Sequence, residues 1–181
     1  MKVCLDPGHG GKDRANRGPS GYIEADGVLD IALRVKELLV KKGIEVVITR
    51  DKDETVSLAK RVAIADGNKA DILVSIHSNA GPPQARGVET FYSAFSKQGK
   101  ALAKEIQIRL VGLGLKDRGI KIRLGKNGAD YYYMIRNPKA VSVITEVGFH
   151  TNPEEEKLLK TASFRQKAAQ AIANGIIAFS R

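Results

Sequence analysis

The sequence predicts an α/β fold built around a largely parallel sheet. Patterns typical of strands alternate with patterns typical of helices along the 181 residues, which favours parallel strands joined by helices. Three short apolar runs at 2–6, 71–76 and 141–145 predict buried strands, since strands covered on both faces are apolar throughout. The chain has no internal repeat, low-complexity tract or linker. We therefore expect residues 1–181 to form one domain.

The first part of the chain predicts three strands and two helices. A glycine-rich loop over 8–27 follows the strand at 2–6. Apolar residues at helical spacing then predict a helix that ends at Gly43: Val28, Ala32, Val35 and Leu39. Residues 44–49 form the second predicted strand. Ser57 is a suitable N-cap for the helix that follows, and the third strand covers 71–76.

The second part predicts a strand at 87–92, a helix over 97–110, a strand at 141–145 and two further helices. Residues 112–135 are rich in glycine, lysine and tyrosine and are left unassigned. Asn152 followed by Pro153 and acidic residues is typical of a helix start. Ser163 to Gln166 matches a capping box. It opens a final helix whose apolar stripe should cover a sheet face: Phe164, Ala168, Ala171, Ile172, Gly175, Ile176 and Phe179.

Composition indicates a basic protein with a core of ordinary size. The net charge is +10 and 43% of the residues are hydrophobic. The stretch from Lys97 to Lys126 contains nine basic and two acidic residues. Such an excess of positive charge suits either a polyanionic partner or a solvated surface. The single cysteine, Cys4, lies in an apolar strand and is predicted to be a core residue. No run is long enough to span a membrane, and no signal peptide is visible.

Two histidines and one acid stand at the ends of predicted strands. His9 follows the first strand, His77 follows the third, and Glu146 ends the run at 141–145. If these strands are parallel neighbours, their ends deliver two imidazoles and a carboxylate to one edge of the sheet. Hydrolytic zinc sites use such groups and leave room for a water. The sequence therefore predicts a zinc site with His9 and His77 as ligands.

The residues alone leave the third ligand open. Asp13, Glu24 and Asp26 all lie in the loop after His9, and spacing does not choose among them. His150, in a predicted loop, is interpreted as a solvated or hydrogen-bonded histidine, with a role as metal ligand left open because histidine is the commonest metal ligand. Glu146 has two interpretations: a salt bridge to a basic neighbour, or a general base that accepts the proton of the attacking water.

Two other catalytic motifs are absent. The glycines around Lys12 lack the spacing of a phosphate-binding loop, and no Gly-x-Ser-x-Gly nucleophile motif is present. A serine hydrolase is therefore not expected.

Ordered segments across nearly the whole chain resemble one enzyme family. The chain is similar to the zinc-dependent N-acetylmuramoyl-L-alanine amidases of the amidase-3 family, which includes cell-separation and sporulation amidases and some phage endolysins. The matching segments are 5–11, Glu24 with 29–33, 47–50, 58–61, 70–80, 87–92 and 145–152.

The resemblance implies a single α/β domain with a mostly parallel, twisted, six-stranded sheet and helices on both faces. It implies His9, Glu24 and His77 as ligands of one zinc ion and Glu146 as the catalytic carboxylate. The implied substrate is peptidoglycan, cut at the amide between the lactyl group of N-acetylmuramic acid and L-alanine. The loop over 14–22 and the region 112–135 depart from the family pattern.

Two rival functions are kept open. A zinc peptidase acting on stem peptides would use the same ligands. A non-catalytic module would use the basic stretch to grip wall polymer, and its binding to nucleic acid would fall steeply with salt. We expect an enzyme that works as a monomer at the cell wall, after loss of a leader or release by lysis. Anionic wall polymers are candidate partners, and nucleic acid is not expected to be one.

Substrate contacts are predicted for a few polar residues: Asn79, Lys126, Asn127 and the tyrosines at 131–133. The alternative is that Asn79 only supports its neighbours and that the tyrosines alternate in and out of a strand.

Overall fold

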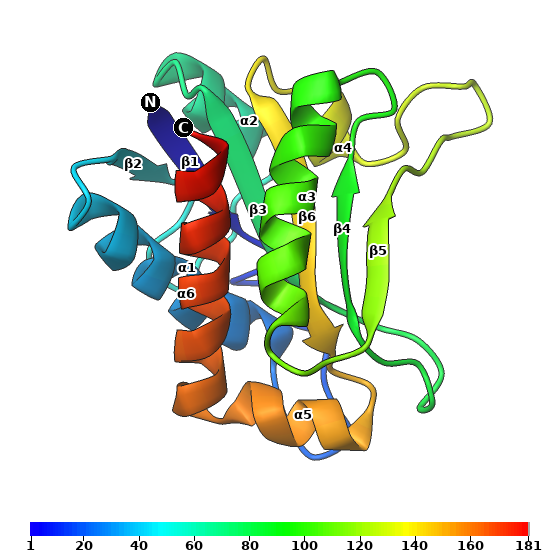
Figure 1. Ribbon diagram of the computed structural model, residues 1–181. Helices are drawn as coiled ribbons and strands as arrows, with labels where there is room; N and C mark the ends of the chain where they lie inside the picture. The colour runs from blue at the N-terminus through cyan, green and yellow to red at the C-terminus, as the bar shows by residue number, and fades with distance from the viewer. Residues whose placement is uncertain (181) are drawn as a thin grey trace.

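The five predicted strands and one further strand form a single six-stranded sheet in the computed structural model, which describes residues 1–180 (Figure 1). The strands are β1 (Lys2–Pro7), β2 (Glu45–Ile48), β3 (Ile72–Asn79), β4 (Val88–Tyr92), β5 (Asp117–Lys121) and β6 (Val141–Phe149). Their order in the sheet is β2-β1-β3-β6-β4-β5. In this order β2, β1, β3 and β6 are parallel to one another. The strand β4 is antiparallel to β6, and β5 is parallel to β4. The α/β fold class is as predicted.

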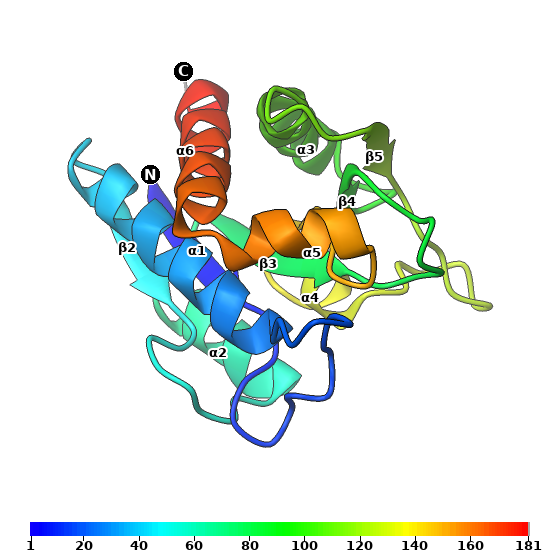
Figure 2. The same ribbon diagram turned by 90° about the horizontal axis from the view of Figure 1, so that it is seen from below.

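Helices cover both faces of this sheet (Figures 1 and 2). They are α1 (Glu24–Val40), α2 (Leu58–Gly67), α3 (Lys97–Val111), α4 (Tyr133–Arg136), α5 (Pro153–Lys160) and α6 (Ala162–Phe179). Val3 and Leu5 of β1 pack with α1, α3 and α6, whereas Cys4 packs with α2 and α4. Because successive side chains of a strand point to opposite faces, two separate apolar clusters sandwich the sheet.

The helices α3 and α6 lie side by side on one face. A Cβ on Gly175 of α6 would lie 2.7 Å from the Cα of Ile106 in α3, so only glycine permits this close approach. The apolar stripe predicted for the final helix is buried from Phe164 to Ile176. Within the described residues, no helix is long and apolar enough to cross a bilayer.

Three details differ from the sequence prediction. The unassigned stretch 112–135 contains β5 and the first residues of α4. The strands β3 and β6 extend beyond their predicted ends, so His77 and Glu146 lie within strands. The capping box at Ser163 is wrong: Thr161 is the N-cap of α6 and its hydroxyl accepts from the Phe164 N–H. Thr161 is also a suitable cap, two residues earlier, and capping there lets the helix begin at Ala162.

Candidate active site

His77 and Glu146 stand side by side on one face of the sheet. They are Cα partners across β3 and β6. Leu73 and Ile144, an even number of residues away on the same strands, belong to the apolar cluster of α2 and α4. Since side chains alternate along a strand, His77 and Glu146 both project on that face. The register of two parallel strands therefore brings the imidazole and the carboxylate together.

His9 lies just beyond β1 in a loop that two buried arginines hold. Its φ is 58°, a left-handed conformation that is unusual for a residue with a side chain. Arg50 donates to the carbonyls of Pro7 and Gly8 at 3.1 and 2.7 Å. Arg61 donates to the carbonyls of Pro7 and His9 at 2.6 and 2.7 Å. These bonds hold the backbone conformation that places His9 beside the end of β3.

Gly8 permits the two histidines to approach each other. A Cβ at this position would lie 2.1 Å from Cε1 of His77, so any side chain would displace the imidazole. The rings of His9 and His77 are 5.0 Å apart between centroids and meet edge to face. The glycine is required here because of the imidazole of the neighbouring strand.

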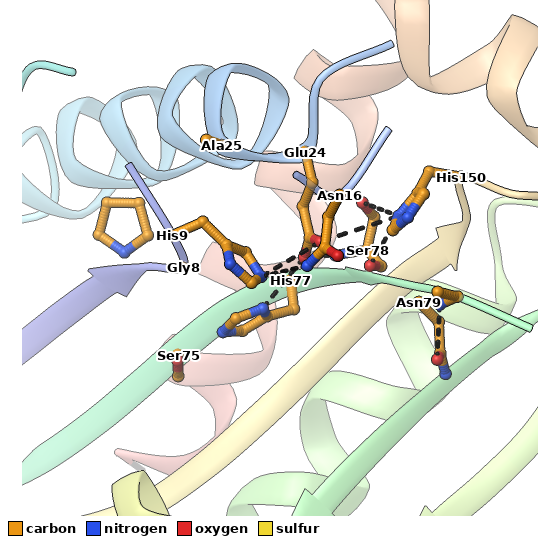
Figure 3. Close-up of polar contacts among 12 residues, drawn as sticks. Gly8, His9, Asn16, Glu24, Ala25, Ser75, His77, Ser78, Asn79 and His150 are labelled. Atoms are coloured by element: carbon orange, nitrogen blue, oxygen red, sulfur yellow. Dashed lines mark hydrogen bonds and ion pairs between the residues drawn. The ribbon is translucent and has the colours of Figure 1, made fainter. Parts of the chain in front are cut away.

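Glu24, the first residue of α1, completes a set of three possible metal donors (Figure 3). Its side chain is 2% exposed. One carboxylate oxygen lies 3.0 Å from Nδ1 of His77, and the other lies 3.2 Å from Nε2 of His9. Donor atoms of the three residues lie within 4.8 Å of one another, whereas the ligands of a tetrahedral zinc ion are about 3.4 Å apart. A small contraction would therefore let all three bind one ion.

The chemistry of these donors fits a divalent ion. Two imidazoles and one carboxylate form a ligand set typical of catalytic zinc, with one coordination position left for water or substrate. Imidazole and carboxylate also accept other divalent metals. The donor set therefore indicates a metal site without identifying its metal.

The other two acids considered as ligands have different partners. Asp13 lies 2.8 Å from Nδ1 of His9, on the side of the ring away from Glu24. A carboxylate there fixes the tautomer and directs Nε2 toward Glu24. Asp26 pairs with Arg14 at 2.6 Å. Neither acid belongs to the donor cluster of the described residues.

His150 is buried and hydrogen-bonded. It is 2% exposed, and its Nδ1 lies 3.0 Å from the carbonyl oxygen of Ser78. Of the two states predicted for it, the hydrogen-bonded one is correct and the solvated one is wrong. The strand β6 runs on to Phe149 and places the next residue inside the molecule.

The proton equilibria of the donors reflect their contacts. Burial alone would raise the pKa of Glu24, but the hydrogen bonds with His77 and His9 outweigh it and hold that pKa well below its usual range. Burial opposes the charged form of His77, yet the bond to Glu24 raises the pKa of this imidazole to about 9. A metal must displace the imidazole proton in order to bind.

Glu146 is the acid with an unused oxygen beside the donors. Burial raises the pKa of its carboxyl to about 8, against the opposing charge of His77. Its Oε2 is buried and has no hydrogen-bond partner among the described residues. A buried carboxylate without a partner is costly, so this oxygen is suited to a ligand or a reacting proton. The alternative prediction of a salt bridge has no support among the described ion pairs.

Sequence reasoning missed the residue that supports this edge of the sheet. Asp6 is buried in β1, and its carboxylate accepts from Thr49, Arg61 and Ser75 at 2.6, 2.7 and 2.6 Å. It ties β1 and β3 to the arginine that holds the His9 loop. The signal was an acid within an apolar strand, since a charged side chain in such a place needs a partner.

The predicted substrate contacts occupy different surroundings. Asn79 donates to Glu89 at 2.6 Å. Tyr131 is half exposed and lies under the Arg123 guanidinium, 3.8 Å from the ring centroid. Tyr132 packs edge to face on Phe91 with ring centroids 5.0 Å apart. Substrate binding by these residues stays a prediction.

A cavity of about 280 Å³ opens on the β1 side of the donors. His9 and His77 line it together with Leu58 of α2 and Met134 of α4. A larger hollow of about 410 Å³ lies around Val141 and Ser142, at the far end of β6. Of these two, the smaller cavity adjoins the candidate ligands, so a substrate group bound there could reach a bound ion.

Residues 3–178 match the family of N-acetylmuramoyl-L-alanine amidases known as amidase-3. The chain belongs to this family. Membership in an enzyme family argues against the non-catalytic binding module that the sequence left open. The match also agrees with the resemblance to this family that the ordered sequence segments had indicated.

Individual amidases support the assignment. The chain is 37% identical to LytC of Bacillus subtilis and 33% identical to AmiA of Salmonella typhimurium. It covers 35% of LytC and 75% of AmiA, with 99% and 98% of its own length aligned. The catalytic domain of CwlV from Bacillus (Paenibacillus) polymyxa superposes with a TM-score of 0.89 at 36% identity, covering 99% of this chain and 97% of that domain.

Proposed function

We propose that this chain is a zinc-dependent amidase of peptidoglycan that cuts between N-acetylmuramic acid and L-alanine. His9, Glu24 and His77 are the proposed zinc ligands, and Glu146 is the proposed acid and base. The observation that carries the proposal is the gathering of three donors, from the loop after β1, from α1 and from β3, within 4.8 Å, next to a carboxylate with a buried oxygen that has no partner among the described residues. The names of the amidase relatives supply the substrate class.

A divalent ion at these donors would polarise the scissile carbonyl and make a water acidic enough to lose its proton. The chain's own residues supply the remaining steps. Glu146 accepts the proton of the attacking water and delivers it to the leaving alanine nitrogen. A carboxyl whose pKa lies near neutrality is suited to both transfers. Asp13 and the arginine-held loop keep His9 in one orientation.

This assignment orients the substrate across the sheet. The proton donor must lie beside the leaving nitrogen, so the peptide leaves over the β6 and β4 side of the site. The muramoyl group then occupies the β1 side, where the cavity of about 280 Å³ lies. The proposed place of action is the cell wall, because the polymer is found there. Anionic wall polymers are also proposed as partners of the basic stretch.

Product analysis on purified peptidoglycan tests the reaction. We expect new N-terminal alanine and free lactyl carboxyl groups, both suppressed by a chelator. Cleavage between amino acids of the stem peptide would identify the rival zinc peptidase instead.

Glu146→Gln tests the catalytic carboxylate. The variant keeps the size of the side chain but cannot accept a proton, so we expect turnover to fall by about 10²–10⁴-fold while bound metal stays at the wild-type level. The measurements are released alanine amine and metal content per chain. More than about a tenth of the wild-type rate would reject Glu146 as the base.

A further inference from the structure

A polar cluster lies on the outer strands of the sheet, next to the paired residues His77 and Glu146. Its centre is Glu89 of β4, the Cα partner of Glu146. Asn79 of β3 and two basic residues of β5, Arg118 and Lys121, surround it. We call these four residues the Glu89 cluster. None of them has a role in the proposed proton transfers.

The charge of Glu89 is fully engaged within the cluster. Its side chain is 6% exposed. Asn79 donates to Oε1 at 2.6 Å, Arg118 donates to Oε2 at 2.8 Å, and the Lys121 ammonium lies 3.3 Å from the same oxygen. Two cations therefore face one buried carboxylate, which leaves a net positive charge at the β5 edge of the cluster. Such a charge attracts an anion that approaches from solvent.

Arg118 is held in place and retains unused donors. Its guanidinium lies over the Phe149 ring at 4.8 Å from the centroid, which restricts the plane of the group. Only Nε donates to another side chain among the described residues. The side chain is 28% exposed. The two remaining nitrogens form the fork that binds a carboxylate through two parallel hydrogen bonds.

The location relative to Glu146 indicates which part of a substrate would reach this fork. Under the proposed function, the leaving nitrogen lies beside Glu146 and the peptide runs toward β4 and β5. Each residue of an extended chain spans about 3.5 Å, and neighbouring strands are about 4.8 Å apart. The residue after alanine therefore reaches the strands that carry Glu89 and Arg118.

We infer that Arg118, supported by Glu89 and Lys121, binds a carboxylate on the residue that follows alanine in the leaving peptide. The inference rests on the proposed function, since that reaction sets the direction of the peptide. It makes Arg118 a determinant of specificity: stem peptides with an acidic second residue are preferred over those in which the same group is a carboxamide.

Two matched soluble substrates test this preference. Both are muramoyl tripeptides whose second residue is glutamate joined through its side chain. One has a free α-carboxylate there, and the other has an α-carboxamide. We expect the wild-type KM to be about tenfold lower for the carboxylate form, as for one charge-assisted contact, with similar kcat for both.

Variants assign the preference to Arg118. Arg118→Gln should bring the two KM values within about twofold of each other. Arg118→Lys keeps the charge but loses the fork, so it should retain part of the preference. Lys100→Gln removes an exposed cation of α3, away from the Glu89 cluster, and should keep the full wild-type ratio.

A binding measurement separates this inference from the proposed reaction. Calorimetry with Glu146→Gln gives the Kd of each tripeptide without turnover, and we expect the same tenfold ratio. Equal affinities, or a ratio that Arg118→Gln leaves unchanged, would overturn the inference. If the wild type cleaves neither tripeptide at the lactyl amide, the proposed function fails, while the Kd ratio still decides whether Arg118 recognises the carboxylate.

Discussion

Arg61, on the β1 side of the site, and Arg118, on the β5 side, both pair with a buried carboxylate but in different surroundings. Arg61 is 4% exposed, and its partner Asp6 is 1% exposed. Its donors contact Asp6 and the backbone carbonyls of Val56, Pro7 and His9. Arg118 is 28% exposed and uses one donor on Glu89. The difference suits two roles. On the β1 side Arg61 holds the backbone that carries His9, whereas on the β5 side Arg118 keeps hydrogen-bond donors exposed to a solute.

The largest expected effect contrasts the two arginines in stability. Arg61→Gln leaves Asp6 buried without its cation, so we expect a loss of about 3–5 kcal/mol in the free energy of unfolding. Arg118→Gln should cost about 1 kcal/mol or less, because Glu89 keeps Asn79 and Lys121 and the arginine is partly solvated. Denaturant unfolding of both variants measures the difference. Equal losses would break the proposed contrast between the two sides.

Acid unfolding sharpens the same contrast. Burial would raise the pKa of Asp6, but the charge of Arg61 and the hydroxyl bonds outweigh it and lower that pKa. Its stabilisation is therefore present above the unfolded pKa of about 3.9 and is lost as the pH falls through the lower folded pKa.

Asp6→Asn should be less stable near neutrality and should show a shallower fall in stability as the pH drops below the unfolded pKa of about 3.9. The exposed Asp51→Asn is the charge-matched control and should retain the wild-type slope. Unfolding midpoints measured across this fall in pH provide the comparison. An unaltered slope in Asp6→Asn would show that the buried pair does not shape acid stability.

A methyl group at position 8 should disrupt the proposed metal site without changing any ligand. Gly8→Ala places a Cβ 2.1 Å from the present position of the His77 imidazole, so the ring must move. We expect metal affinity to fall by at least about 10–100-fold, the range seen when ligand orientation is lost. Gly67→Ala is the control, since a Cβ there meets nothing within 4 Å. Competition with a coloured chelator measures the metal affinity of each variant.

The smallest expected effect concerns the carboxylate behind His9. Asp13→Asn keeps an acceptor for Nδ1 but removes the charge, and the side chain of Asp13 is 62% exposed. We therefore expect a decrease of about tenfold in metal affinity, at the low end for such partners. The same chelator assay applies, with Asp51→Asn as the control. A loss as large as that of Gly8→Ala would place Asp13 among the ligands, as the sequence had allowed.

Local patterns were sufficient to predict five of the six strands and most helices, but not β5. The apolar runs of β1, β3 and β6 predicted their own burial, and His77 and Glu146 directly follow two of those runs. The third donor was different. In the sequence only the family resemblance distinguished Glu24 from Asp13 and Asp26 as the third ligand. All three acids fall in the same predicted loop, and their spacing along the chain does not show which of them lies close to the histidines.

Tertiary structure decided how these groups meet. The Cα pairing of His77 with Glu146, and of Glu146 with Glu89, depends on strand register, which chain order does not encode. The left-handed His9 is held by Arg50 and Arg61, which follow it by 41 and 52 positions. The sequence by itself determined the chemical types and the periodicity of burial, since both are local properties. Only packing determined the contacts among distant side chains, because many registers satisfy the same apolar pattern.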